Sequence, residues 1–97
     1  MPSPKGESPM FRLWAKILID NHLIKDMVVC NDTKDTRTQK VFLAIDEICL
    51  AFDLGKPIWL DSTVSDFKRH SKTRFYQDNF IETIDFDYLE IHVIEEG

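Results

Sequence analysis

Glycine is scarce in this chain, which has three glycines, Gly6, Gly55 and Gly97, among its 97 residues. Nucleotide-binding loops of the GxGxxG and GxxxxGK[ST] types need several glycines at short spacing, so that backbone N–H groups can approach a phosphate. The three glycines here are too widely separated to form either loop. The sequence therefore excludes enzymes that hold a nucleotide on a loop of these types.

Cysteine is also rare, and long apolar runs are missing. Cys30 and Cys49 form no CxxC pair and no Cys-His cluster with zinc spacing. His22, His70 and His92 fall in different predicted elements, so we expect no metal and no cofactor. No apolar run approaches the ~20 residues that span a bilayer, and no signal peptide is recognisable. Two free thiols are typical of a reducing compartment, and we expect a soluble cytoplasmic protein.

Positive charge is in deficit, with 12 Lys and Arg against 17 Asp and Glu, a formal net charge of −5. An anionic surface repels nucleic acids and anionic membranes, so such a partner requires a local basic patch.

The length fits one domain, which we place at residues 10–97. Residues 1–9 (MPSPKGESP) hold three of the four prolines and show no periodicity, which predicts a flexible leader or the remnant of an expression tag.

Alternating apolar residues predict a hairpin at the start of the domain and a strand at its end. Residues 11–19 alternate with period 2, and the turn-forming segment 20–22 (DNH) precedes a returning strand that ends near residue 30. Residues 88–96 (YLEIHVIEE) alternate in the same way, with Leu89, Ile91 and Val93 on one face. These patterns predict three strands that are each buried on one side.

Helical periodicity is clearest at residues 37–54. Thr36 and Gln39 have the spacing of a capping box, and an apolar stripe follows at i, i+4, i+7, i+8 and i+11. Gly55 is expected to take the left-handed conformation that ends the helix, and Pro57 prevents its continuation. The stripe consists of Val41, Ile45, Ile48, Cys49 and Phe52.

The segment between this helix and the last strand is harder to assign. Residues 57–61 (PIWLD) are too short for a helix and predict a brief edge strand, a position that suits Pro57. Thr63 and Asp66 have capping-box spacing, which predicts a short helix that turns Val64 and Phe67 inward and ends near residue 72. Residues 73–86 show no clear period, although Phe75 or Phe80 is expected to anchor the segment in the core.

The predicted fold is α+β, with the order strand, strand, long helix, strand, short helix, strand. We expect a mixed four-stranded sheet with the long helix packed on one face. This order resembles the β-grasp, or ubiquitin-like, fold, and the resemblance implies that the last strand lies parallel to the first in the middle of the sheet. Ubiquitin-like carriers act through a Gly-Gly tail, whereas this chain ends VIEEG, so the resemblance implies no conjugation. The segments FDLGKPIWLD and FKRHSKTRFYQDNF are also similar to those of small uncharacterised bacterial proteins, which implies no function.

The sheet face opposite the helix is the first candidate binding surface. Trp14 and Leu18 lie on the outward parity of the first strand, and Tyr88 and His92 on that of the last. If these strands are neighbours, the four side chains form one aromatic and apolar patch that suits a protein partner. Two alternatives remain, in which a loop covers the patch or Trp14 packs against Lys and Arg stems.

The second candidate is the basic and aromatic segment at residues 67–76. Its cations and one aromatic ring suit a weak, salt-dependent contact with an anion or a nucleic acid. The alternative is structural, because cations stabilise the C-terminal end of a helix and can face the segment 76–97, which has no Lys or Arg. The residues concerned are Lys68, Arg69, Lys72, Arg74 and Tyr76, of which Arg74 and Tyr76 are the pair that a helix end does not explain.

An enzyme is the third possibility and the least favoured. Cys30 at a strand end with a histidine, or a carboxylate pair, is the kind of group that would carry catalysis, but no motif requires one. We assign no catalytic residue and expect a small binding module, with a protein partner first and a nucleic acid second. The sequence leaves the oligomeric state open.

Overall fold

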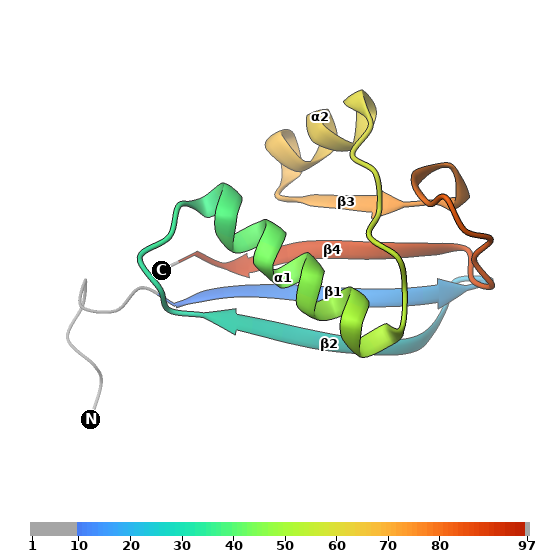
Figure 1. Cartoon of the computed structure of the whole chain (residues 1–97), viewed down its shortest axis with the longest axis horizontal. Helices are drawn as coiled ribbons and strands as arrows, with labels where there is room; N and C mark the ends of the chain where they lie inside the picture. The colour runs from blue at the N-terminus through green and yellow to red at the C-terminus, as the bar shows by residue number, and fades with distance from the viewer. Residues whose placement is uncertain (1–9, 97) are drawn as a thin grey trace.

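The computed structural model describes residues 10–96, so the predicted leader at residues 1–9 lies outside the described part. Four strands form a single sheet in the order β2-β1-β4-β3, and every neighbouring pair is antiparallel. Helix α1 crosses one face of this sheet, and α2 lies beyond the β3 edge (Figure 1). The elements are β1 (Phe11–Ile19), β2 (His22–Asn31), α1 (Arg37–Phe52), α2 (Asp61–His70), β3 (Lys72–Phe75), the 3-10 turn η1 (Gln77–Asn79) and β4 (Tyr88–Glu95).

The N-terminal hairpin agrees with the sequence pattern. Strands β1 and β2 are joined by Asp20 and Asn21, which both have positive φ values of 51° and 66°. Short polar side chains tolerate this left-handed conformation, and two such residues in sequence match the right-handed twist of a tight hairpin. The predicted hairpin at residues 10–30 is therefore confirmed, with its turn at the predicted position.

Helix α1 also begins where the sequence predicts. The Thr36 side chain accepts a hydrogen bond from the Gln39 backbone N–H at 3.2 Å, which satisfies one of the free donors of the first turn. Four of the five residues of the predicted apolar stripe are buried, and Phe52 is partly buried against the core. This burial is what holds the helix to the sheet, because the stripe is its contact surface.

Helix α1 ends at Phe52, two residues before the predicted end at residue 54. The left-handed residue is Asp53, with φ 57°, and its backbone N–H bonds to the Leu50 carbonyl oxygen at 3.4 Å. Aspartate tolerates this conformation because its side chain is short and polar. Gly55, which was expected to fill this role, instead donates its backbone N–H to Oε1 of Glu82 at 3.1 Å.

The core lies between the sheet and the two helices. Phe11, Leu13, Ala15 and Ile17 of β1 alternate inward, as the period-2 pattern predicts. On the last strand the predicted inward residues are likewise buried, and Phe75 and Phe80 anchor the preceding segment. The remaining buried apolar residues are Val29, Val41, Ala44, Ile45, Ile48, Cys49, Phe67 and Phe86.

The predicted α+β fold is confirmed, with four strands, one long helix, one short helix and the last strand in the middle of the sheet beside the first. The direction of that last strand differs, because β4 runs antiparallel to β1 and the sheet is not mixed. The reason is visible in the path of the chain, since β4 begins beside the end of β1, with Tyr88 opposite Leu18 (Figure 1). The parallel arrangement that the β-grasp resemblance implied is therefore wrong for this chain.

The strand at the far edge is also not the one that the sequence suggested. Residues 57–61 form no strand, and the fourth strand is β3, within the segment that showed no clear period. Trp59 of segment 57–61 turns into the core instead, with its ring centroid 5.1 Å from that of Phe75 and 5.6 Å from that of Phe67. Helix α2 accordingly begins at Asp61, two residues before the predicted cap, and ends at His70.

One buried polar side chain connects segment 57–61 to the turn that follows β3. Asn79 donates from its amide nitrogen to the Ile58 carbonyl oxygen at 2.8 Å and to the Thr63 hydroxyl at 3.0 Å. Its amide oxygen accepts the Tyr76 backbone N–H at 3.0 Å. Three bonds from one buried amide replace the ladder bonds that a strand at residues 57–61 would have made.

Candidate functional site on the open sheet face

The open face is the side of the sheet opposite α1, and it contains the first set of predicted binding residues. The register places Trp14 directly opposite His92, and Leu18 directly opposite Tyr88. All four side chains are half-buried, and neither α1 nor α2 lies over them. The sequence prediction that these residues share one face of adjacent strands therefore agrees with the structure, whereas their role in binding remains a prediction.

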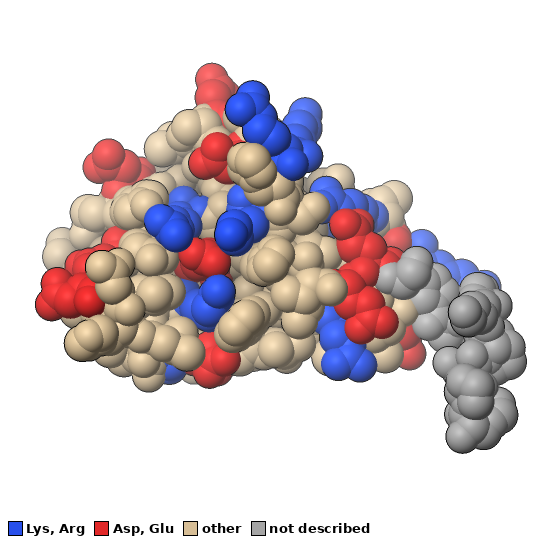
Figure 2. Space-filling view, turned by 180° about the vertical axis from the view of Figure 1, so that it is seen from behind, with Lys and Arg blue, Asp and Glu red and all other residues tan. Residues whose placement is uncertain are grey.

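A row of charged side chains crosses the centre of this face. Lys16 on β1 pairs with Asp26 on β2 and Glu90 on β4, and Glu90 pairs in turn with Arg74 on β3. The Glu90 carboxylate lies 3.1 Å from Nζ of Lys16 and 3.0 Å from Nε of Arg74, and its side chain is only 7% exposed. Figure 2 shows this face, with Lys and Arg side chains gathered near its centre around acidic ones. The ion pairs of the row therefore join β1, β4 and β3 through Glu90, while Asp26 extends the row of charged side chains onto β2.

The ionisation of Glu90 and Arg74 reflects this pairing. Burial raises the pKa of Glu90, but hydrogen bonds from Lys16 and Arg74 more than offset it, so that the pKa lies below its ordinary value. The pKa of Arg74 is raised, first by a hydrogen bond to the Tyr76 side chain and then by one to Glu90. Each charge therefore keeps its partner ionised around neutral pH.

The pKa of His92 is lowered below its ordinary value. Partial burial is the main cause, followed by the charges of Lys72 and Lys16, while Glu90 acts in the opposite direction. The neutral imidazole is therefore favoured near pH 7. A neutral His92 adds a polar but uncharged group to the patch beside Trp14.

Aromatic rings border the charged row on both sides. On one side the Lys16 ammonium lies 4.1 Å from the Trp14 ring centroid, and the Trp14 indole N–H donates to Asp26 at 2.9 Å. On the other side the Arg74 guanidinium lies 4.6 Å from the Tyr88 ring centroid. Trp14 thus does pack against a lysine, as one alternative anticipated, and the face consists of rings that are paired with cations.

The second set of predicted residues divides between two places. Lys72 lies opposite His92 on the open face, and Arg74 lies beside it on the same strand. The Tyr76 ring extends this group, with its centroid 5.4 Å from that of Tyr88. Lys68 and Arg69 instead lie in the last turn of α2, where cations complement the helix dipole. The segment that the sequence presented as one basic patch therefore contributes to two separate surfaces.

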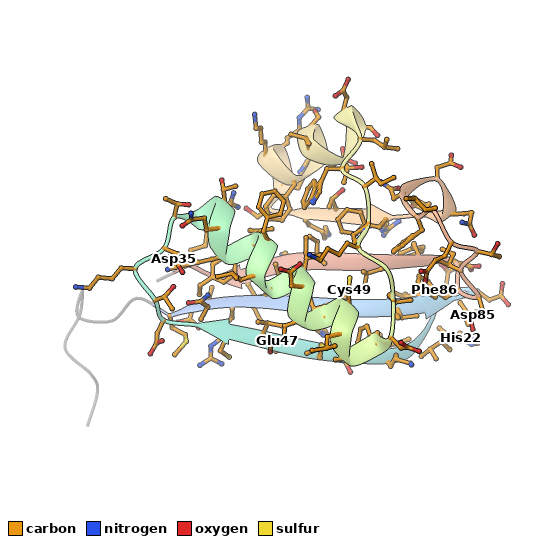
Figure 3. All side chains as sticks on the ribbon, viewed as in Figure 1. His22, Asp35, Glu47, Cys49, Asp85 and Phe86 are labelled. Carbon is orange, nitrogen blue, oxygen red and sulfur yellow. The ribbon has the colours of Figure 1, made fainter. Side chains whose placement is uncertain are left out.

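The two thiols lie in different environments, one exposed and one buried. Cys30 is exposed and lies opposite Arg12, while His92 lies two strands away and two residues further along, a separation of about 12 Å from sheet spacings. Cys49 is buried on α1 (Figure 3), and desolvation, followed by the charge of Asp46, raises its pKa to about 11. Within residues 10–96, no group of three His, Cys, Asp or Glu side chains is placed to hold a metal ion.

Comparison with known proteins places no constraint on the function. No model of a protein family, no curated protein and no solved structure matches this chain. In the part of the chain that the structure describes, no helix is long and apolar enough to cross a membrane.

The sequence indicated the apolar residues of this face but not its charged row. Lys16 and Glu90 both lie on the outward parity of their strands, which is the one signal that the sequence contains. Their pairing depends on the register between β1 and β4, which are separated by more than 60 residues and whose relative direction was predicted incorrectly. The sequence alone therefore does not indicate that Glu90 is buried between two cations.

Proposed function

We propose that this protein is a small binding module that docks a protein partner on the open face of its sheet. The observation that supports the proposal is the adjacency of Trp14, Leu18, Tyr88 and His92 on two central strands, with Arg74 beside them. Tryptophan, tyrosine and arginine are the residues that most often dominate the energy of protein interfaces. A flat sheet face also offers the continuous area that a protein contact requires.

The charges of this face favour a protein over a nucleic acid. Arg12 pairs with Glu95 at 2.9 Å, and Lys16 and Arg74 share Glu90. Binding to phosphates gains its energy from cations that release counterions, and cations that already hold a carboxylate release few. A protein surface with an apolar centre and charges of both signs can instead contact the row without breaking its ion pairs.

A pair of variants on opposite sides of the molecule tests the proposal. The double variant Trp14→Ala and Tyr88→Ala removes the two large rings of the open face. The control, Leu43→Ala and Leu50→Ala, removes apolar side chains on α1 that are 49% and 85% exposed. Each tagged protein would be used to recover partners from cells of its host, with nuclease treatment, after circular dichroism has shown that it is folded.

We expect a protein that binds the unchanged chain and the control but not the open-face variant. A hot-spot ring contributes at least ~2 kcal/mol, so the loss of one ring alone should weaken binding roughly 30-fold or more. A partner that is retained by the folded open-face variant would overturn the proposal. If that variant does not fold, Leu18→Lys provides the same test, because a lysine at this half-buried outward position can extend into solvent.

The nucleic-acid alternative has its own discriminating measurement. Fluorescence anisotropy with single-stranded RNA, single-stranded DNA and duplex DNA at low salt should show no binding at micromolar protein. Binding that weakens steeply with salt and is lost in Arg74→Glu would instead favour a nucleic acid on the same face. That result would replace the protein partner rather than add to it.

A further inference from the structure

A groove lies between α1 and α2, on the side of the molecule away from the open face. Its volume is about 210 Å³, and its apolar lining includes Phe42, Trp59 and Phe67. The charged residues that line it, Arg37 and Lys68, are both cations. Both differ in sign from the chain as a whole, which has a net charge of −5.

The apolar floor of the groove is held in place by edge-on aromatic contacts. The Trp59 ring centroid lies 6.2 Å from that of Phe42 and 5.6 Å from that of Phe67, with nearly perpendicular planes. A third ring, Phe75, is fully buried and contacts Trp59 from the sheet at 5.1 Å. Phe42 is nevertheless 49% exposed, so the groove has a rigid floor and a wall that is open to solvent.

The rim of the groove already holds a carboxylate. The Arg37 guanidinium lies 5.0 Å from the Phe67 ring centroid and donates to the Ser71 hydroxyl at 3.1 Å. These two contacts fix its orientation, and its Nε donates to Oε1 of Glu96 at 2.7 Å. Both side chains of this ion pair are nearly half exposed, so Glu96 is a replaceable partner in an otherwise preorganised site.

We propose that this groove binds an acidic peptide segment of a partner protein, with one bulky apolar side chain on the Trp59 floor and an adjacent carboxylate on Arg37 in place of Glu96. An apolar cavity of about 150 Å³ holds benzene, so the groove accommodates one phenyl side chain. It is smaller than the ~300–1,000 Å³ that is typical of small-molecule sites, which favours a side chain over a free ligand. Lys68, in the last turn of α2 with Arg69 and His70, supplies further positive potential beside the rim.

The test uses Trp59 as its own reporter. The chain has two tryptophans, so Trp14→Phe leaves the groove residue as the one fluorophore of this kind. The probe is a synthetic pentapeptide with a central phenylalanine flanked by aspartate and glutamate, capped at both ends. We expect saturable binding with a change in Trp59 emission, at least tenfold weaker binding when the central phenylalanine is replaced by alanine, and no binding of a lysine-flanked peptide.

Variants of the rim separate recognition from nonspecific attraction. Lys68→Gln and Arg37→Gln should each weaken binding at least threefold, whereas Glu96→Gln should strengthen it because Arg37 is released. Lys25→Gln is the matched control, since it removes an exposed cation of β2 outside the groove. No saturation at millimolar peptide, equal binding of the alanine peptide, or equal effects of Lys25→Gln and Lys68→Gln would overturn the proposal.

The open face provides the final distinction. Tyr88→Ala should leave peptide binding unchanged, because Tyr88 lies on the other side of the sheet. Loss of peptide binding in that folded variant would place the peptide on the open face and overturn the groove. Failure of the groove would leave the proposed protein contact of the open face unaffected, since the two share no residue.

Discussion

Replacing Glu90 by glutamine should destabilise the protein more than its position on a sheet surface suggests. The carboxylate is almost fully buried and contacts two cations, Lys16 at 3.1 Å and Arg74 at 3.0 Å. Glutamine keeps the shape and one carbonyl oxygen but removes the negative charge. The two cations are then left beside a neutral amide at the centre of the open face.

The size of the loss in unfolding free energy depends on how much of the Lys16 and Arg74 side chains is exposed to water. Breaking a buried ion pair typically costs about 3–5 kcal/mol, and a charge-assisted hydrogen bond contributes roughly 1.5–3 kcal/mol. Here the Arg74 side chain is 48% exposed and that of Lys16 is 19% exposed, so water compensates for part of the loss. We therefore expect a loss of about 2 kcal/mol, which corresponds to a fall in Tm of roughly 8–16 °C for a domain of this size.

The loss of stability in Glu90→Gln should be largest near neutral pH and should become smaller at acidic pH. The pKa of Glu90 in the folded protein lies below its ordinary value, because the bonds from Lys16 and Arg74 outweigh the effect of burial. The unfolded chain therefore takes up its proton first, near pH ~4.3. The contribution of the charge is complete above that pH and is lost as the pH falls through the folded pKa. The difference in stability between wild type and Glu90→Gln should shrink correspondingly.

Urea denaturation at fixed ionic strength between pH 3 and pH 7, followed by circular dichroism, measures this difference. Glu47→Gln is the matched control, because Glu47 is an exposed glutamate on α1 (Figure 3) and should change stability by less than ~0.5 kcal/mol. A loss below ~0.5 kcal/mol for Glu90→Gln would refute the reasoning. So would a loss of 2 kcal/mol that stays constant down to pH 3, since it would then arise from packing rather than charge.

Three further predictions concern the interior. A thiol reagent should modify Cys30 and leave Cys49 unmodified in the native protein, whereas both thiols should react in urea. Rapid reaction of both thiols in the native protein would contradict the burial of Cys49. Asn79→Ala should lower the free energy of unfolding by about 1–3 kcal/mol in urea titrations, since it leaves the buried Thr63 hydroxyl and two partly buried backbone groups without this partner. Thr73→Val should be neutral or stabilising in the same titrations, because the buried Thr73 hydroxyl has no hydrogen-bond partner among the described residues; a loss above ~1 kcal/mol would be evidence against this.

The fold was predictable where local periodicity and burial agree. The hairpin and α1 are continuous patterns with their own turn and cap residues, so Asp20, Asn21 and Thr36 lie where the sequence places them. The direction of β4 was not predictable in this way, because either direction buries Leu89, Ile91 and Val93 equally well. What decides it is the end of the sheet at which the chain re-enters, and that depends on residues 53–87, which have no strong period.

The identity of the edge strand could not be predicted from the sequence either. Residues 57–61 have the composition of a strand, yet Trp59 packs against the core through Phe67 and Phe75 and the segment forms no edge strand. The bonds of Asn79 to Ile58 and Thr63 make that placement possible. A single buried amide that bonds to two distant segments produces no periodic pattern in the sequence. The hydrogen bonds of Asn79 are therefore not predictable from the sequence.

Glu90 places a buried carboxylate on the open face, and this carboxylate also orders the cations and rings around it. In many proteins a buried ion pair stabilises the fold no better than apolar residues of the same volume, so stability alone does not call for ion pairs at this position, although removing Glu90 by itself leaves two cations unpaired. What it does accomplish is positional, since it holds Lys16 over the Trp14 ring and Arg74 over the Tyr88 ring. Side chains that are already ordered lose less entropy on association. If the open face binds a partner as proposed, Glu90 is a positioning residue, and its loss should weaken partner binding even where the fold is retained.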